Sequence, residues 1–341
     1  MIANIISKHS FQLTDTVAVA EYELAFDSDY GGKSQFVCHK KVTAGEDDFI
    51  IVFDGKKVYQ GIITSIETEK GKDSCEITAI EMPKLFDQKI ILTNESLLQT
   101  GIEDFIADQI TSNFISNEDD IVNIDYLTVT AKTHTPISAK VQTDDGVYNL
   151  CTYIGNALTN YGIFIDFEFT RESLNVIIEK REQAAFDIDT SIVDVSNLKE
   201  VRDIKALTKL TVLWKGTTRY FFLRTDRTIT EDMSDPDRAK GTTDIIISEA
   251  ETEAEMRQEA EDKFTANTYN HKISFDVIPT SKLIPESDLF IGHKCRVKTD
   301  TGIRNSIISG INRSNDRKTI SVTLGKMKVT LIEKLKGVET K

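Results

Sequence analysis

The chain has 341 residues, 40% hydrophobic and 28% charged, which is typical of a globular protein of two or three domains. Its 41 basic and 55 acidic residues give a formal net charge of −14, so specific nucleic-acid binding is disfavoured. We expect no membrane span and no export signal, because no apolar run approaches ~18 residues and the N-terminus lacks a basic region before an apolar one. Four separated cysteines predict neither a disulfide framework nor a zinc ribbon: Cys38, Cys75, Cys151 and Cys295.

Residues 11–82 have the pattern of consecutive strands, with side chains that alternate roughly with period two from Val17 to Phe26. The clearest hairpin joins residues 49–53 to 58–66 through Asp54-Gly55, a dipeptide that favours a type I′ turn with two positive φ angles. Residues 75–80 follow as a third strand. This part of the chain is therefore predicted to be a β-meander within a small barrel or sandwich.

From about residue 91 the hydrophobic period changes to that of helices. Thr100 and Glu103 have the spacing of a capping box, and apolar residues from Ile102 to Phe114 fall on one helical face. A second helix is expected from Val147 to Tyr161, closed by Gly162 in a left-handed conformation. Strand-like runs at 121–130, 163–169 and 174–178 complete a predicted α+β insertion over residues 93–186.

After residue 191 the chain returns to strands. Residues 209–214 and 218–223 flank a hairpin signal at Lys215-Gly216-Thr217. Ser248 and Glu251 suggest a second capping box, which would open a helix near 249–266. Strands are expected again from residue 272 to about 332.

An internal repeat links the two ends of the chain. The segment from Gly45 to Ile66 can be laid over the segment from Gly292 to Ile311, so that residues 62–66 (IITSI) fall on residues 307–311 (IISGI). Each copy continues through a charged turn into another strand. The alternative is that two unrelated β-hairpins look alike.

The charge is distributed unevenly along the chain. Residues 291–341 carry a net charge of +8 and residues 1–290 one of −22. Opposite charges on separate parts of one chain favour head-to-tail self-association, although a solvated basic tail is the alternative.

No catalytic, cofactor-binding or metal-binding residue is singled out. The five histidines lie in separate contexts, and Gly32-Lys33-Ser34 lacks the preceding glycine of a phosphate loop. The acidic runs 117–120 and 226–237 lack the pattern of a calcium-binding EF-hand loop. Asp166 and Glu168 could form a glycosidase-like pair, but alternate placement along a strand explains them equally well.

Two β-modules around an α+β insertion, with the runs 292–297, 307–311 and 321–325, resemble a known family. The chain is similar to phage tail-tip or baseplate hub proteins, especially the N-terminal hub portion of prophage tail-associated lysins, the prophage endopeptidase tail family. The chain resembles, within this group, a Listeria-type prophage tail protein.

This resemblance implies a β-rich, multidomain α+β fold with two small tube-like β-barrel modules, at 1–92 and 187–341, around the insertion at 93–186. Residues 187–225 could instead partly complete the first module. The family forms trimeric pseudo-sixfold rings that join the tail tube to the tip and let DNA pass.

The resemblance therefore implies a structural, non-enzymatic virion protein without a cofactor. It would assemble in the host cytoplasm with distal tail and tip or fibre proteins. The chain stops too soon after residue 325 for a peptidoglycan-cleaving domain. The alternative from a different functional class is a carbohydrate-binding or carbohydrate-active protein that uses acidic clefts of the central module.

Overall fold

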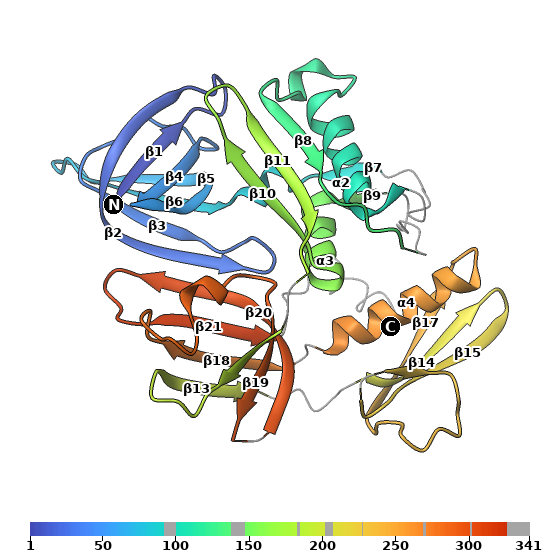
Figure 1. Cartoon of the computed structure of the whole chain (residues 1–341). Coiled ribbons are helices and arrows are strands. Elements are labelled where there is room, and N and C mark those ends of the chain that lie inside the picture. Colours follow the sequence, from blue (N-terminus) through green and yellow to red (C-terminus); the bar gives the residue numbers. More distant parts are fainter. Residues whose placement is uncertain are drawn as a thin grey trace.

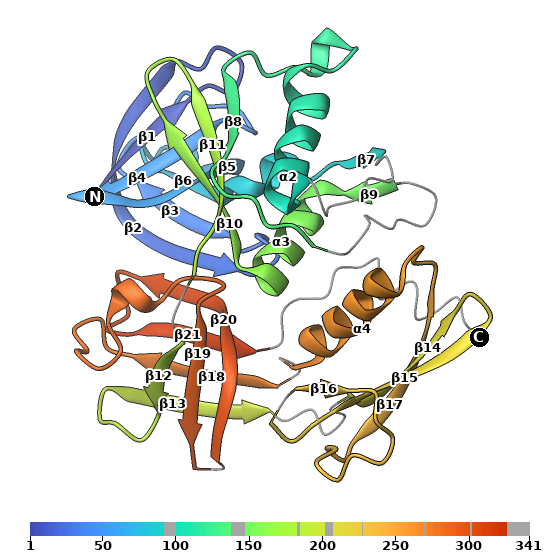
Figure 2. The same cartoon turned by 45° about the vertical axis from the view of Figure 1, so that its right-hand side comes forward.

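The computed structural model of the chain describes residues 1–91, 100–137, 147–182, 185–201, 207–226, 228–268, 271–300 and 302–325. Strands account for 48% of the structure and helices for 17%, which confirms the expected β-rich α+β fold. Two β-modules lie one above the other, the helices α2 and α3 flank the first, and a smaller sheet with helix α4 stands to one side (Figures 1 and 2).

The first module, here called module 1, is a closed barrel of six strands. They are β1 (Ile2–Ile6), β2 (Leu13–Asp27), β3 (Ser34–Cys38), β4 (Phe49–Asp54), β5 (Lys56–Thr68) and β6 (Cys75–Glu81). The strand order is β1-β4-β5-β6-β3-β2, and an antiparallel β1–β2 pairing closes the barrel. Alternate side chains fill its interior, as the period-two pattern predicts, with Phe36 and Ile77 fully buried.

The insertion follows module 1 directly. A 3₁₀ helix η1 (Met82–Phe86) leads to β7 (Lys89–Ile91), α2 (Ile102–Ile110), the π-helical turn η2 (Thr111–Ile115), the 3₁₀ helix η3 (Asp120–Val122) and β8 (Leu127–Ala131). Then come β9 (Val147–Asn149), α3 (Leu150–Tyr161), β10 (Ile163–Phe169) and β11 (Leu174–Lys180). The strands β10, β11 and β8 form one sheet, and β7 pairs with β9.

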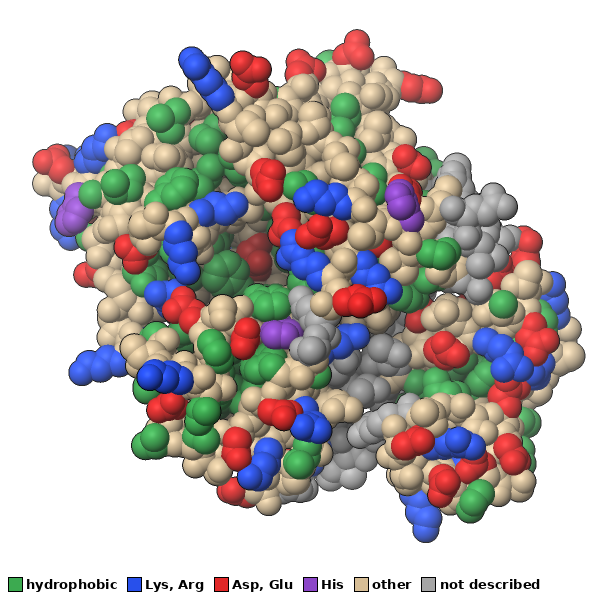
Figure 3. Space-filling view, in the orientation of Figure 1, with side chains coloured by type: hydrophobic (Ala, Val, Ile, Leu, Met, Phe, Trp, Pro, Cys, Tyr) green, Lys and Arg blue, Asp and Glu red, His purple; other side chains and the backbone are tan. Residues whose placement is uncertain are grey.

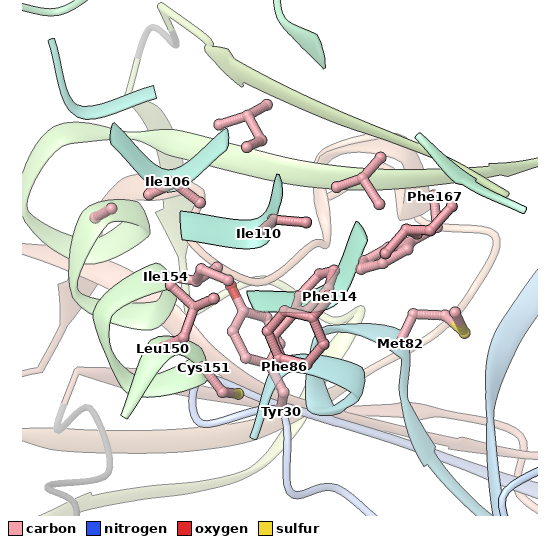
Figure 4. Close-up of a cluster of buried hydrophobic side chains, with 14 of the residues drawn as sticks. Tyr30, Met82, Phe86, Ile106, Ile110, Phe114, Leu150, Cys151, Ile154 and Phe167 are labelled. Carbon is pink, nitrogen blue, oxygen red and sulfur yellow. The ribbon is translucent and has the colours of Figure 1, made fainter. Parts of the chain in front are cut away.

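A single hydrophobic core joins the insertion to module 1. Figure 4 shows side chains of α2 and α3 converging on Phe86 of η1 and on Tyr30, which lies between β2 and β3. Phe86 packs edge-on against Phe114 and is stacked with Phe167. Because these contacts are apolar and buried, they hold the insertion firmly against the barrel.

The second module, here called module 2, also has six strands. They are β12 (Phe186–Asp189), β13 (Val195–Val201), β18 (Lys272–Val277), β19 (Lys294–Thr299), β20 (Gly302–Ser314) and β21 (Ile320–Gly325), with the 3₁₀ helix η5 (Glu286–Asp288) before β19. Their spatial order is β12-β19-β20-β21-β18-β13. Strand β12 runs parallel to β19, and within the described residues no pairing joins β12 to β13.

A smaller unit lies between β13 and β18 in the sequence. Strands β14 (Leu207–Trp214), β15 (Thr217–Leu223), β16 (Ile229–Thr230) and β17 (Thr242–Ser248) form a four-stranded sheet, and α4 (Glu253–Thr268) packs on it. The expected segment 187–341 thus contains strands of two sheets. Residues 195–201 pair with β18 of module 2 and not with module 1.

The two predicted hairpin turns differ in conformation. At Asp54-Gly55 only Gly55 has a positive φ, of 71°, so the expected type I′ turn is wrong there. A bulge between Val52 and Phe53 accommodates the tighter connection. Lys215 and Gly216 have φ angles of 47° and 76° and directly link β14 to β15, as a type I′ turn requires.

Both predicted capping boxes are also wrong in position. The N-cap of α2 is Gly101, and Glu103 instead accepts hydrogen bonds from Thr133 and Thr135. Helix α4 opens four residues later than expected, where the Glu255 amide donates to the Thr252 hydroxyl and the Glu255 carboxylate accepts from the Thr252 amide.

The predicted helix start at Val147 is likewise wrong, because that residue lies in β9 and α3 begins at Leu150 after the N-cap Asn149. The expected strand over 121–130 is confined to β8, and η3 precedes it. Gly162 closes α3 with a φ of 71°, as expected.

Candidate assembly interfaces

The two modules share one arrangement of strands. Numbered along the chain, both have the spatial order first, fourth, fifth, sixth, third and second, and the pairings among the second to sixth strands are antiparallel in both. The first strand differs, because β1 runs antiparallel to β4 whereas β12 runs parallel to β19. The repeat noticed in the sequence is thus part of a common module topology.

The repeated hairpins have the same register from Phe49 to Val52, before the bulge in β4. Phe49 faces Ile62 in module 1, and Lys294 faces Ile307 in module 2. Asp47 and Gly292 both have positive φ angles, of 73° and 88°. Their amides donate to the carbonyls of Ile63 and Ile308 respectively. The structural partner of Gly292 is therefore Asp47, two residues beyond the Gly45 that the sequence alignment chose.

The two modules are joined by strand pairing. Residues 23–27 of β2 pair antiparallel with residues 310–314 of β20. Strand β1 pairs with the same edge of β2, but at residues 13–18. Asn315 extends the contact, because its side chain accepts from the Tyr22 amide and donates to the Ala20 carbonyl. The barrel of module 1 and the sheet of module 2 are thereby joined into one continuous sheet.

A cavity of about 270 Å³ lies where both modules meet the insertion. Residues of module 1, of β10 and α3, and Ile291 before β19 line it, and Figure 3 shows a hollow with hydrophobic side chains in this region. The Tyr59 hydroxyl is buried there without a hydrogen-bond partner among the described residues, and burial raises its pKa. Burial also lowers the pKa of Lys57, whose ammonium donates to Gln60.

The four-stranded sheet has one covered and one exposed face. Ile246 packs toward α4, whereas Ile245 and Ile247 are 64% and 79% exposed on the opposite face. Leu213 on β14 is also exposed and lies opposite Ile247, and exposed Tyr220 on β15 is separated from Ile245 by Thr211 of β14. The outer face of this sheet is therefore an apolar surface.

The basic segment, residues 291–341, forms ion pairs within the chain in its described part, residues 291–300 and 302–325. Five of its arginines and lysines lie close to carboxylates: Arg296–Asp187, Lys298–Asp189, Arg304–Glu200, Arg313–Glu286 and Arg317–Glu23. Acidic and basic side chains are interspersed over the face in Figure 3. Much of the charge expected to attract a neighbouring subunit thus has partners in its own chain; residues 326–341 lie outside the described part.

The residues considered for chemistry have structural partners. Asp166 forms an ion pair with Arg181, and exposed Glu168 faces Asn175 on β11. The carbohydrate-binding alternative would be favoured by an exposed aromatic side chain, but Trp214, the single tryptophan of the sequence, donates from Nε1 to the Ala250 carbonyl at 2.6 Å and packs on the α4 core. Ser34, from the Gly-Lys-Ser run, is buried in β3 and its hydroxyl donates to the Ala25 carbonyl.

Among the described residues no group of three or more metal-ligating side chains is gathered, and none of the described helices is long and apolar enough to cross a membrane. The β2–β20 junction was missed by the sequence analysis. The unusual length of the alternating run before Asp27 is the one signal that could have indicated it.

No protein-family model matches the sequence, and no curated protein is significantly similar to it. Solved structures with a similar fold include prophage tail proteins. A prophage tail protein, gp18, from Listeria monocytogenes EGD-e aligns over 99% of this chain and 98% of its own, with 12% identity and a TM-score of 0.57.

A tail protein from Neisseria meningitidis MC58 aligns over 95% and 96% of the two chains, with 10% identity and a TM-score of 0.55. The 43 kDa tail protein of prophage MuSo2 from Shewanella oneidensis covers 96% and 99%, with 12% identity and a TM-score of 0.53. The resemblance to phage tail proteins noted in the sequence is confirmed, at the level of the fold.

Proposed function

We propose that this chain is a structural subunit of a phage tail tip or baseplate hub, without enzymatic activity, located in the virion. The observation that carries the proposal is the pair of β-modules with one strand order, joined side by side through β2 and β20. Similarity along nearly the whole length to solved tail proteins supports it.

In this proposal three chains form a ring of six modules, which joins the tail tube to the tip and encloses a passage for DNA. A contact repeated head to tail closes into a ring when its rotation fits. With −14 per chain, the passage would repel DNA rather than hold it. Distal tail proteins on one face and tip or fibre proteins on the other would be its partners, met during assembly in the host cytoplasm.

Two measurements test this function. Light scattering over a range of protein concentrations should approach a molar mass of about three times 38.3 kDa, because association depends on concentration. Antibody labelling of purified phage particles should place the protein at the tail end. A protein absent from particles would overturn the proposal, and a particle-bound monomer or dimer would overturn the ring.

A further inference from the structure

The strand contact between the two modules leaves two matching edges open on the same chain. In module 2, β13 is the terminal strand, and its edge away from β18 has no strand beside it among the described residues. It lies on the side of module 2 that faces away from module 1 (Figures 1 and 2). In module 1, β4 covers β5 only as far as Ile62.

The open part of β5 is the equivalent of the part of β20 that β2 covers. Ile77 on β6 faces Ile66, and Val322 on β21 faces Ile311, so Ile66 corresponds to Ile311. Residues 65–68 of β5 pair with β6 on one side only. The matching residues 310–313 of β20 pair with β2 on their second side.

The open edge of β13 is likewise the equivalent of the edge of β2 that holds β20. Phe36 on β3 faces Ile77, and Phe275 on β18 faces Val322, so these two buried phenylalanines correspond. Glu23 faces the residue before Phe36, and Lys199 faces the residue before Phe275. Lys199 is therefore the counterpart of Glu23.

We infer that β13 of one copy pairs antiparallel with residues 67–69, at and just beyond the end of β5, in a second copy, and so reproduces the β2–β20 junction between chains. The inference rests on the proposed ring and names its contact. Transfer of the β2–β20 register places Lys199 opposite Glu69, Glu200 opposite Thr68, and Val201 opposite Glu67.

The chemistry of the two edges fits this pairing. Lys199 would meet the carboxylate of Glu69, which within its own chain already pairs with Lys72 at 2.5 Å, and the side chain of Val201, now 62% exposed, would become partly buried. The bulge of β13 lies before Lys199, just as the bulge of β2 lies before Glu23, so neither interrupts the paired stretch. The edge of β13 contains no proline that would block pairing.

A disulfide trap tests the contact. Between β2 and β20 the Ser28 amide donates to the Ser309 carbonyl, and the Asn315 amide donates to the Tyr22 carbonyl. Hydrogen-bonded and non-hydrogen-bonded pairs alternate along an antiparallel ladder, so Ser314, the counterpart of Glu69, belongs to a non-hydrogen-bonded pair. Such pairs have Cα atoms about 4.5 Å apart, within the range a disulfide spans. The Lys199→Cys/Glu69→Cys protein should therefore form covalent multimers on mild oxidation, while the four native cysteines stay buried.

The matched control is Lys199→Cys/Glu67→Cys, in which the second cysteine lies two residues away from the position opposite Lys199. The two Cα atoms are then about 8 Å apart, which is too far for a disulfide. It should cross-link at least several-fold more slowly, and the single variants no faster than this control. Equal rates in all of these proteins would overturn the pairing. A threefold molar mass without selective cross-linking would support the ring and place its contact elsewhere. A monomeric molar mass without selective cross-linking would contradict the ring as well.

A second variant probes the backbone. Thr68 corresponds to Arg313, whose N–H points toward β2, so Thr68→Pro removes a donor from the open edge and leaves the β6 side intact. Self-association should weaken by about tenfold, as expected for the loss of a backbone hydrogen bond. Thr68→Ala should leave it unchanged. Equal self-association of the proline and alanine variants would contradict the proposed edge.

Discussion

Thr64 and Ser309 make the same hydrogen bond in the two modules. Each lies at the bulge between the fifth and sixth strands, and each hydroxyl donates to the carbonyl of a threonine 14 residues further on, Thr78 at 3.2 Å and Thr323 at 3.4 Å. A bulge displaces one residue from the ladder. The hydroxyl occupies a place where regular backbone pairing is interrupted, which explains why a small hydroxylated residue stands at both positions.

Removal of either hydroxyl should therefore have a similar effect. We expect Thr64→Ala and Ser309→Ala each to lower the free energy of unfolding by about 1 kcal/mol, since an ordinary hydrogen bond contributes that much. Urea denaturation measures this change. The hydroxyl-retaining variants Thr64→Ser and Ser309→Thr are the controls, and a loss in them equal to that of the alanine variants would contradict the role of the bond.

The core of the insertion gives a second prediction. Ile106 on α2 and Leu150 on α3 are each 1% exposed in the cluster of Figure 4. Ile106→Asp or Leu150→Asp should destabilise the insertion by about 3 kcal/mol or more, because either change buries an unpaired carboxyl group. Thermal melting followed by circular dichroism checks this. Ile121→Asp, at a site 92% exposed, should melt like the wild type.

Local patterns predicted most elements of this fold, including both insertion helices and the repeated hairpins. They did not predict which sheet a strand joins. Residues 195–201 and 209–223 lie close together in the sequence, yet the former complete module 2 and the latter belong to a separate sheet, because long-range pairing decides the partner.

The β2–β20 junction escaped prediction for the same reason, since its paired residues are 283 to 291 positions apart in the sequence and the length of the run before Asp27 does not indicate the partner strand. The capping boxes failed on a smaller scale. Glu103 has the right spacing from Thr100, but the hydroxyls of Thr133 and Thr135 compete for its carboxylate.

Glu103 gives a prediction about pH. Its side chain is buried, and burial opposes its ionisation, yet hydrogen bonds from Thr135 and Thr133 outweigh that effect and hold its pKa below the ordinary value of 4.5. A lowered folded-state pKa stabilises the fold above the unfolded-state pKa, and this contribution is lost as pH falls through the folded-state value.

Glu103→Gln should therefore be less stable than wild type at pH 6, and the difference should shrink as the pH falls below about 4.5. Urea denaturation at several pH values measures this. Glu118→Gln, at an exposed site, is the control and should track the wild type throughout. A difference that is constant with pH would mean that shape, not charge, makes Glu103 important.

At the contact between α3 and α4, we expect stability to change with pH in the opposite direction. Tyr161 donates to Asp262 at 2.7 Å and Gln258 donates to its other oxygen, but burial outweighs these bonds and raises the pKa of Asp262 above 3.8. An acid with a raised folded-state pKa stabilises the fold most below its unfolded-state pKa, and this contribution is lost as pH rises through the folded-state value.

Asp262→Asn removes the ionisation while an amide oxygen still accepts the Tyr161 hydroxyl, and the Gln258 amide can rotate to accept from the new NH₂ group. We expect this variant to be more stable than wild type at pH 7 and equal to it below about pH 3.8. Tyr161→Phe should instead lose about 1 kcal/mol at acid pH, where the neutral acceptor remains. Denaturation curves in which Asp262→Asn is the less stable protein at pH 7 would show that the ionised carboxylate holds α4 against α3.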